Sequence, residues 1–256
     1  MPITKVVHKE MMPILNKPAI HYLVNEAIDA GIEEIILVIS KRKEMIKQYF
    51  FNDEKMIKEL KEKDRLHFID DILKINKQIK LSFVYQEEQL GLSHAIYQAS
   101  KIVGNEPFVV MLGDCLLKES HSTLKTMIDK SIKTNSSVIL VDQVKQTEVN
   151  KYGIVDIDKE EDGIFKINKA LEKPSIDEAP SNYAIIGRYV FTNDTMQSLN
   201  SKEFKTSKKS FTETFMQNKN VHALKLKESQ WFDLGSKAGF VKANIAFAQD
   251  DKEIIL

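Results

Sequence analysis

The sequence of 256 residues holds one cysteine, Cys115, and no excess of charge of either sign. A single cysteine excludes an internal disulfide framework and fits a reducing cytoplasm. Lys and Arg number 37, as do Asp and Glu, so no overall field draws the chain to nucleic acid or an anionic membrane. No apolar run approaches the ~20 residues that span a bilayer, and no secretion signal opens the sequence. We therefore expect neither nucleic acid nor a membrane as a partner.

What the sequence does contain is a long alternation of buried strands and helices. Hydrophobic residues make up 43% of the chain, enough for one large α/β domain. The alternation predicts a doubly wound, mainly parallel sheet with helices on both faces. We expect strands at residues 35–39, 80–85, 108–112 and 137–144, and helices at 18–30, 41–51, 53–73, 93–103 and 123–133.

From residue 152 onward the pattern is typical of a hairpin. Residues 154–157 and 164–171 flank Asp162-Gly163, a favoured turn dipeptide. Further strands are expected at 183–191 and 221–226, and a helix at 239–249. Because no repeat or linker divides the chain, we expect a single domain over residues 1–256.

An acid and a base stand side by side at Glu172-Lys173. Neighbouring strand residues point to opposite faces, so both can serve one site only if the chain bends, and Pro174 supplies a bend. A carboxylate accepts hydrogen bonds from hydroxyls, and an ammonium holds a phosphate. The pair therefore suits a sugar phosphate, although a solvated pair before a turn explains the same residues.

Other candidates are weaker when taken singly. Asp114 follows a predicted buried strand, where it can ligate Mg²⁺ or begin a turn. Asp233 alone is typical of a cap or loop residue before the last helix, and Lys9 of a solvated side chain. Gln86 and Gly91 follow another strand, where an amide and close backbone approach suit a base.

Several blocks in a fixed order resemble the sugar-nucleotide pyrophosphorylases, in the branch of bacterial UTP–glucose-1-phosphate uridylyltransferases. They are residues 4–5, 9–14, 17–20, 91–95, 113–114, 152–155, 172–174, 179–190 and 232–236. The resemblance runs from Met1 to about Ala248. It implies an Mg²⁺-dependent nucleotidyltransferase that makes UDP-glucose and pyrophosphate from UTP and glucose 1-phosphate.

The resemblance also implies roles for individual residues. The carboxylates would hold the metal, the lysines would offset phosphate charge, and the remaining residues would bind uracil or glucose. They are Lys9, Asp114 and Lys173 for catalysis; Gln86 and Gly91 for the nucleotide; Gly153, Glu172, Lys173 and Asn182 for the sugar; and Asp114 with Asp233 for the metal.

The sequence departs from the family at four places. His8 replaces the usual proline, and Cys115 stands where many relatives have a second aspartate. Ser93 replaces the usual glycine, and we expect it to be the N-cap of the following helix. The region 207–216 differs from the family's polar segment, although Thr212-Glu213 resembles a remnant of its T-D pair.

In that family a strand and a glycine-rich G-x-G-T-R loop precede the segment that matches Met1 to Lys5. Backbone N–H groups of such a loop hold nucleotide phosphates. The present sequence starts after the loop, so we expect an N-terminally truncated domain without its first strand. Two alternatives stay open: a relative that uses dTTP or another sugar, and an inactive truncated paralogue that binds a sugar phosphate or a partner subunit. A homo-oligomer is also left open.

Overall fold

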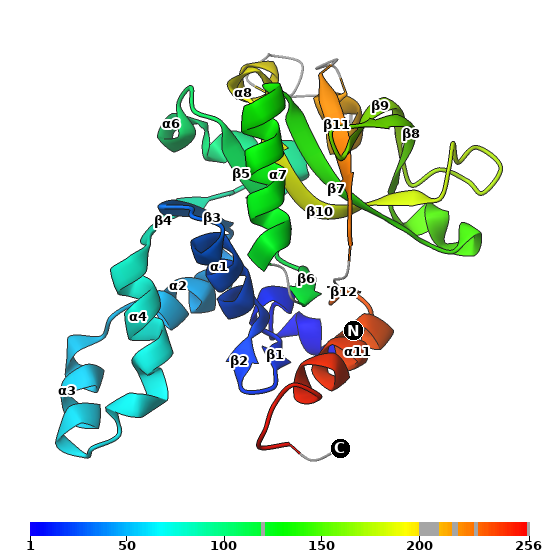
Figure 1. Ribbon diagram of the computed structural model, residues 1–256. Helices are drawn as coiled ribbons and strands as arrows, with labels where there is room; N and C mark the ends of the chain where they lie inside the picture. The colour runs from blue at the N-terminus through cyan, green and yellow to red at the C-terminus, as the bar shows by residue number, and fades with distance from the viewer. Residues whose placement is uncertain (119–120, 200–209, 217–219, 228–229, 255–256) are drawn as a thin grey trace.

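The computed structural model describes residues 1–118, 121–199, 210–216, 220–227 and 230–254. At its centre lies a six-stranded sheet with the order β5-β10-β7-β11-β9-β8 (Figure 1). Each strand contains a run that the sequence predicted as extended. The strands are β5 (Phe108–Met111), β7 (Ser137–Gln143), β8 (Gly153–Glu161), β9 (Ile164–Glu172), β10 (Tyr183–Phe191) and β11 (Val221–Lys225).

The strands of this sheet run in mixed directions. β7 and β11 are parallel, whereas β10 is antiparallel to β5, β7 and β8. β9 is antiparallel to both β8 and β11. The predicted α/β class is confirmed, but the sheet is mixed rather than mainly parallel. Apolar runs identify buried strands without giving their direction, and the β8–β9 hairpin and β10 contribute antiparallel neighbours.

Helices cover both faces of the central strands because these strands are apolar on both sides. In β7, Val138 and Leu140 belong to the cluster under α7, while Ile139 and Val141 belong to the cluster on the opposite face. Side chains of α5, α8 and α10 complete that second cluster. The bounds of these helices are α5 (Leu92–Gln98), α7 (His121–Thr134), α8 (Asn193–Leu199) and α10 (Phe211–Phe215).

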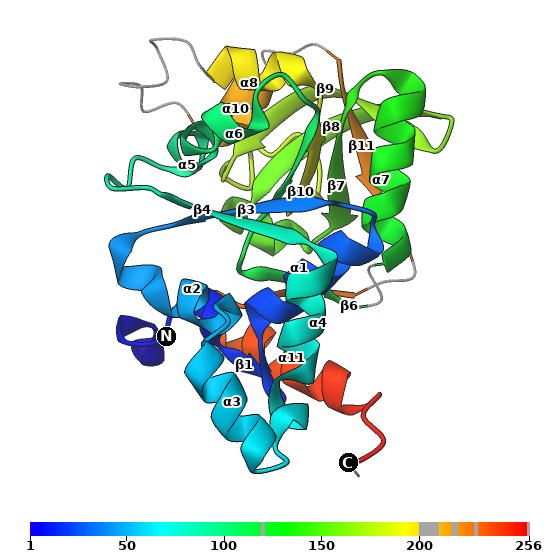
Figure 2. The same cartoon turned by 90° about the vertical axis from the view of Figure 1, so that its left-hand side faces the viewer.

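A second, two-stranded parallel sheet pairs β3 (Glu34–Ile39) with β4 (Lys80–Tyr85). Its apolar side chains pack with those of α1 (Ala19–Asp29), α2 (Glu44–Phe50) and α4 (Asp70–Gln78). The helix predicted at residues 53–73 is divided into α3 (Glu54–Glu62), a 3-10 turn and the start of α4. Figures 1 and 2 show α3 projecting away from both sheets, and no residue of α3 is buried.

A third unit joins the two ends of the described chain. Its strands are β1 (Pro13–Ile14), β2 (Lys17–Pro18), β6 (Cys115–Lys118) and β12 (Gln230–Asp233), and its helix is α11 (Lys237–Ala248). β6 pairs antiparallel with β12, so the residues that follow Asp114 lie against those that end at Asp233. None of these four strands was predicted, because two to four residues are too few to show a period.

Several shorter elements also occur. A predicted single helix is divided into α5 and α6 (Ser100–Val103), and 3-10 turns occur at Lys9–Met11 and Gln146–Lys151. Across the described residues, no helix has both the length and the apolar character needed to cross a membrane.

Candidate active site

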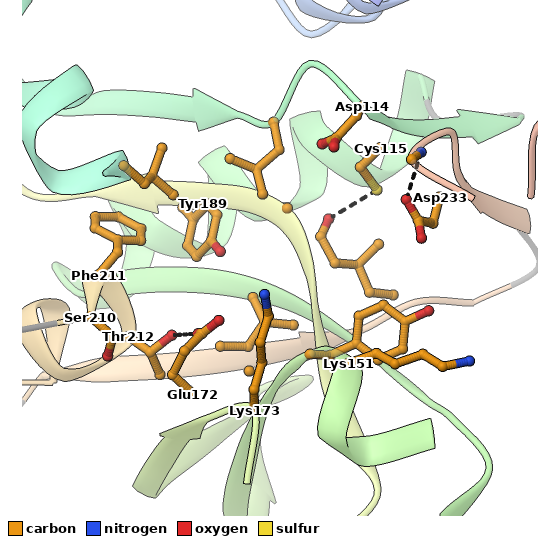
Figure 3. Close-up of a pocket in the computed structure, with 18 of the residues that line it drawn as sticks. Asp114, Cys115, Lys151, Glu172, Lys173, Tyr189, Ser210, Phe211, Thr212 and Asp233 are labelled. Carbon is orange, nitrogen blue, oxygen red and sulfur yellow. Dashed lines mark hydrogen bonds between the residues drawn. The ribbon is translucent and has the colours of Figure 1, made fainter. Parts of the chain in front are cut away.

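A cavity of about 670 Å³ lies between the six-stranded sheet and the β6–β12 pair. Segments from both halves of the sequence line it, as the close-up in Figure 3 shows. The lining residues that carry a predicted role are Lys9, Gly91, Asp114, Gly153, Glu172, Lys173 and Asp233. The structure therefore brings together seven of the nine residues singled out from the sequence.

The two candidate metal ligands are fixed by the backbone that joins them. Cys115, which follows Asp114, is the direct partner of Asp233 in the β6–β12 pair. The Leu234 amide donates a 2.8 Å hydrogen bond to the carbonyl of Asp114. Both aspartates consequently belong to one hydrogen-bonded unit, even though they are far apart in the sequence.

Gly235 keeps a side chain away from both of these carboxylates. A Cβ atom at this position would lie 2.9 Å from Oδ1 of Asp233 and 3.7 Å from Oδ2 of Asp114. It would also lie 3.1 Å from Nζ of Lys9. The donors are hard carboxylate oxygens, the kind that Mg²⁺ prefers. Within the described ranges, no group of three or more His, Cys, Asp or Glu side chains could hold a metal by itself, so substrate phosphates and water would have to complete the coordination.

Lys9 is the cation that the structure places in this cluster. Its Nζ lies 3.1 Å from Oδ2 of Asp114. Burial opposes the charged ammonium, but the hydrogen bond and charge of Asp114, together with Asp233 and Glu10, raise the pKa of Lys9. The side chain is therefore a protonated ammonium at neutral pH.

Glu172 and Gly153 face each other on the neighbouring strands β8 and β9. A Cβ atom on residue 153 would lie 3.2 Å from Oε2 of Glu172, so glycine gives this carboxylate its room. The hydroxyl of Thr212 donates a 2.6 Å hydrogen bond to the same Oε2. Figure 3 shows this bond at the edge of the cavity.

Lys173 enters the same cavity because the chain turns sharply at this residue. Its φ is +48°, in the left-handed region that L residues with side chains rarely occupy. The Lys173 amide donates to the carbonyl of Tyr152 at 3.0 Å, which holds the turn. The predicted bend after Glu172 is present, and it lies at Lys173 itself rather than at Pro174. Such strain at a cavity is a feature of functional sites.

Another part of the cavity lining is formed by Gly91, Leu92 and Ser93. Gly91 has a φ of +97°, which favours glycine. The prediction that Ser93 caps the helix is wrong, because Gly91 occupies the N-cap position and Ser93 lies inside α5. The Ser93 hydroxyl is buried and has no hydrogen-bond partner among the described residues.

Two predicted residues lie outside the cavity lining. The Gln86 amide donates to the carbonyl of Gly91 at 3.1 Å and lies 3.1 Å from Nδ1 of His94. Asn182 donates to the carbonyl of Val144 at 3.2 Å. Both side-chain amides therefore donate hydrogen bonds to backbone carbonyls beside the site.

Other residues of the lining were not predicted as site residues. Lys151, Tyr189, Thr212 and Trp231 all contribute to it. The first, second and fourth of these stand next to or inside a block that was recognised in the sequence, and this adjacency was the only available signal. For Thr212 it came from the remnant T-D pair.

Comparisons with known proteins identify the family of this chain. A nucleotidyl transferase family model matches residues 1–250, so the chain belongs to the nucleotidyl transferase family. The UTP–glucose-1-phosphate uridylyltransferase 1 of Staphylococcus saprophyticus is 38% identical over 255 residues, which cover 98% of this chain and 88% of that protein.

Two solved structures extend the similarity to three dimensions. A UTP-bound UGPase from Acinetobacter baumannii has a TM-score of 0.88 and 32% identity, with 99% of this chain and 90% of that one covered. A UDP-glucose pyrophosphorylase complexed with UDP-glucose has a TM-score of 0.83 and 33% identity, with 98% and 94% covered. The resemblance inferred from sequence motifs is thereby confirmed at the level of family and fold.

Proposed function

We propose that this chain is a UTP–glucose-1-phosphate uridylyltransferase, which forms UDP-glucose and pyrophosphate. The observation that carries the proposal is the shared cavity. Asp114, Asp233 and Lys9 line one part of it, and Glu172 and Lys173 line another. A sugar phosphate held by the second group has its phosphate directed toward a nucleotide held by the first. The relatives described above support the same reaction, since one is a UTP–glucose-1-phosphate uridylyltransferase and the two solved structures contain UTP and UDP-glucose.

The reaction would be an in-line displacement at phosphorus. A phosphate oxygen of glucose 1-phosphate forms a bond to the α-phosphorus of UTP while the bond from that phosphorus to the pyrophosphate oxygen breaks. No protein atom is bonded covalently in this step, so the protein contributes by positioning and by offsetting charge. Lys9 and Lys173 supply ammonium groups for the phosphates, and Glu172 accepts hydrogen bonds from glucose hydroxyls.

The nucleotide is proposed to lie along the wall formed by Gly91 and its neighbours. The left-handed backbone at Gly91 allows a flat base to approach closely without a side chain in between. Gln86 is proposed to reach the base from behind Gly91, and this requires its amide to exchange the Gly91 carbonyl for a uracil edge. Asn182 is a proposed sugar-side residue as well, and this role requires its amide to exchange the Val144 carbonyl for the sugar.

Mg²⁺ is the proposed cofactor, held by Asp114 and Asp233. When bound, it would neutralise phosphate charge and help to orient the reacting groups. The hard oxygen donors suit such an ion, and glycine at position 235 keeps a side chain away from them.

We further propose that residues 1–256 act as one nucleotidyltransferase domain in the cytoplasm. The family model covers almost this whole range. The single cysteine is a free, buried thiol and needs no oxidising compartment.

The test is direct product analysis by ³¹P NMR. Purified protein with UTP, glucose 1-phosphate and Mg²⁺ should yield UDP-glucose and pyrophosphate in equal amounts, and dTTP should be used poorly. Asp114→Asn should remove the metal-dependent rate, and Lys173→Met should weaken the calorimetric affinity for glucose 1-phosphate. Binding of glucose 1-phosphate without any turnover by the unaltered protein would contradict the proposed activity and favour a non-catalytic paralogue.

A further inference from the structure

Arg188 forms a fully buried ion pair with a residue that is 162 positions away in the sequence. Its side chain is 0% exposed and that of its partner Glu26 is 2% exposed. Nε of Arg188 donates to Oε1 of Glu26, and Nη2 donates to Oε2, both at 2.8 Å. The planar guanidinium therefore meets the carboxylate at two points, which fixes its orientation as well as its position.

The same guanidinium makes a third contact, to the strand that carries the candidate metal site. Nη2 of Arg188 donates to the carbonyl of Cys115 at 3.0 Å. Cys115 directly follows Asp114 and is paired with Asp233 across the β6–β12 ladder. Arg188 is consequently hydrogen-bonded, from the protein core, to the paired backbone segments that carry both carboxylates.

Glu26 connects the pair to the lysine of the same cluster. It lies on α1, whose first residue, Ala19, donates to the carbonyl of Met12 at 3.0 Å. Met12 is the C-cap of the 3-10 turn Lys9–Met11. The ion pair thus connects α1, which carries Glu26, with β6, which follows Asp114. Arg188 itself lies on β10.

Stability alone is a weak explanation for such a pair. Removing two charges from water is costly, and apolar residues of similar volume often replace a buried ion pair without loss of stability. An apolar replacement would, however, lose the directed bond from Arg188 to the Cys115 carbonyl. The distinctive contribution of the pair is therefore the fixed position of this backbone.

We infer that Arg188, supported by Glu26, is a positioning residue that sets the placement of the Asp114 and Asp233 carboxylates for divalent-cation binding. This inference rests on the function proposed above, because it concerns the metal site of that reaction. Arg188 touches neither substrate nor cation, and it acts through the carbonyl of Cys115. Removing its fork should loosen the metal site and leave the sugar side of the cavity intact.

Two variants separate the geometry from the charge. Arg188→Lys keeps a buried cation but replaces the planar fork by a point charge. The double variant Glu26→Met/Arg188→Met removes both charges together, so it leaves no uncompensated ion and folds even if the single variant does not. Ile75→Ala, in the apolar cluster around α4, is the matched control for a general loss of core stability.

The first readout is Mn²⁺ binding to the protein without substrates, followed by electron paramagnetic resonance. Both variants should raise the Mn²⁺ dissociation constant by ~10-fold or more, as loss of an outer-shell partner of a metal ligand does. Ile75→Ala should leave it unchanged at a temperature where all proteins are folded. An unchanged Mn²⁺ dissociation constant in the folded double variant would overturn the inference.

The second readout separates the metal site from the substrate sites. The Mg²⁺ concentration for half-maximal rate should rise and kcat should fall by ~10- to 100-fold, while KM for glucose 1-phosphate stays unchanged. An equal weakening of metal and sugar phosphate binding would show general disruption and overturn a positioning role. If the unaltered protein makes no UDP-glucose, the proposed function fails, whereas the Mn²⁺ shift still decides the role of Arg188.

Discussion

The ammonium nitrogen of Lys9 lies 3.1 Å from Oδ2 of Asp114, although the two residues are 105 positions apart in the sequence. The ammonium is thus hydrogen-bonded to a carboxylate oxygen that a bound divalent cation would also need as a ligand. Gly235 borders this same space, close to both Asp114 and Asp233. Lys9 and the cation should therefore compete for the cluster until a phosphate offers Lys9 another partner.

Replacing Lys9 should tighten metal binding while slowing the reaction. In Lys9→Met the competing ammonium is gone, so the free protein should bind Mn²⁺ more strongly than the unaltered protein does. Turnover should fall by ~100-fold or more, because a preorganised group that stabilises phosphate charge is lost. Mn²⁺ titration and initial rates measure the two effects.

Lys151→Met is the matched control for this experiment. Lys151 also lines the cavity, but its ammonium pairs with Glu148 at 2.8 Å rather than with the aspartates. Because Asp233 acts on Lys151 only through its charge, the loss of Lys151 should change Mn²⁺ affinity less than the loss of Lys9 does. Weaker Mn²⁺ binding in Lys9→Met would show that Lys9 supports the metal instead of competing with it.

Thr212→Val should impair sugar recognition selectively. Valine preserves the shape of threonine but removes the 2.6 Å hydrogen bond to Oε2 of Glu172. A hydrogen bond to a charged group contributes about 1.5–3 kcal/mol, so KM for glucose 1-phosphate should rise by roughly 10- to 100-fold while KM for UTP changes little. Steady-state kinetics with each substrate varied in turn give both values.

Thr212→Ser supplies the control, since it retains the hydroxyl and should keep nearly full affinity for the sugar phosphate. Equal KM values for glucose 1-phosphate in Thr212→Val and the unaltered protein would show that Glu172 needs no support from α10.

Much of the fold could be predicted because long buried strands have continuous apolar sequences. β3, β4, β7 and β10 were all found in this way. β6 and β12 were missed, since each has four residues and is defined by pairing with a strand that is distant in the sequence. The directions of the strands could not be predicted either. A strand such as β10 is apolar on both faces whether its neighbours are parallel or antiparallel.

In the site, too, features that depend on neighbouring residues could be predicted, whereas contacts between residues distant in the sequence could not. Glu172 and Lys173 could be assigned to one cavity from the need for a bend, which is a local property. Thr212 could be noticed only as a remnant, because its bond to Glu172 spans 40 positions. The directions of the Gln86 and Asn182 amides depend on neighbouring carbonyl groups that no motif identifies.

Ser93→Ala should stabilise the protein. The Ser93 hydroxyl is buried without a partner among the described residues, and an unsatisfied buried polar group costs about 1–3 kcal/mol. Alanine is also the better helix former at this position inside α5. Calorimetry should show a melting temperature raised by roughly 2–4 °C for a gain of 1 kcal/mol.

Ser131→Ala should have the opposite effect and serves as the control. The Ser131 hydroxyl is also buried, but it donates a 2.6 Å hydrogen bond to the carbonyl of Ser136, so its removal should lower the melting temperature. A lower melting temperature in Ser93→Ala as well would mean that the Ser93 hydroxyl is hydrogen-bonded in solution.

His21 should make the protein sensitive to mild acid. Its ring is 1% exposed, and Nδ1 lies 2.9 Å from the Tyr49 hydroxyl. Burial, assisted by the charge of Lys17 and opposed by that of Asp71, lowers the pKa of His21 from 6.5 to about 4. Between these two values the unfolded chain binds a proton that the folded protein does not bind, so stability is lost as pH falls.

The expected loss is about 3 kcal/mol between pH 6.5 and pH 4, from 1.36 kcal/mol for each unit of pKa. Urea unfolding at several pH values measures it. His21→Gln cannot titrate in this range and should flatten the pH dependence by about that amount, whereas His67→Gln, at an exposed position, should leave the dependence unchanged. If His21→Gln and the unaltered protein lose stability in parallel as pH falls, His21 is protonated in the folded state, and another group accounts for the acid sensitivity.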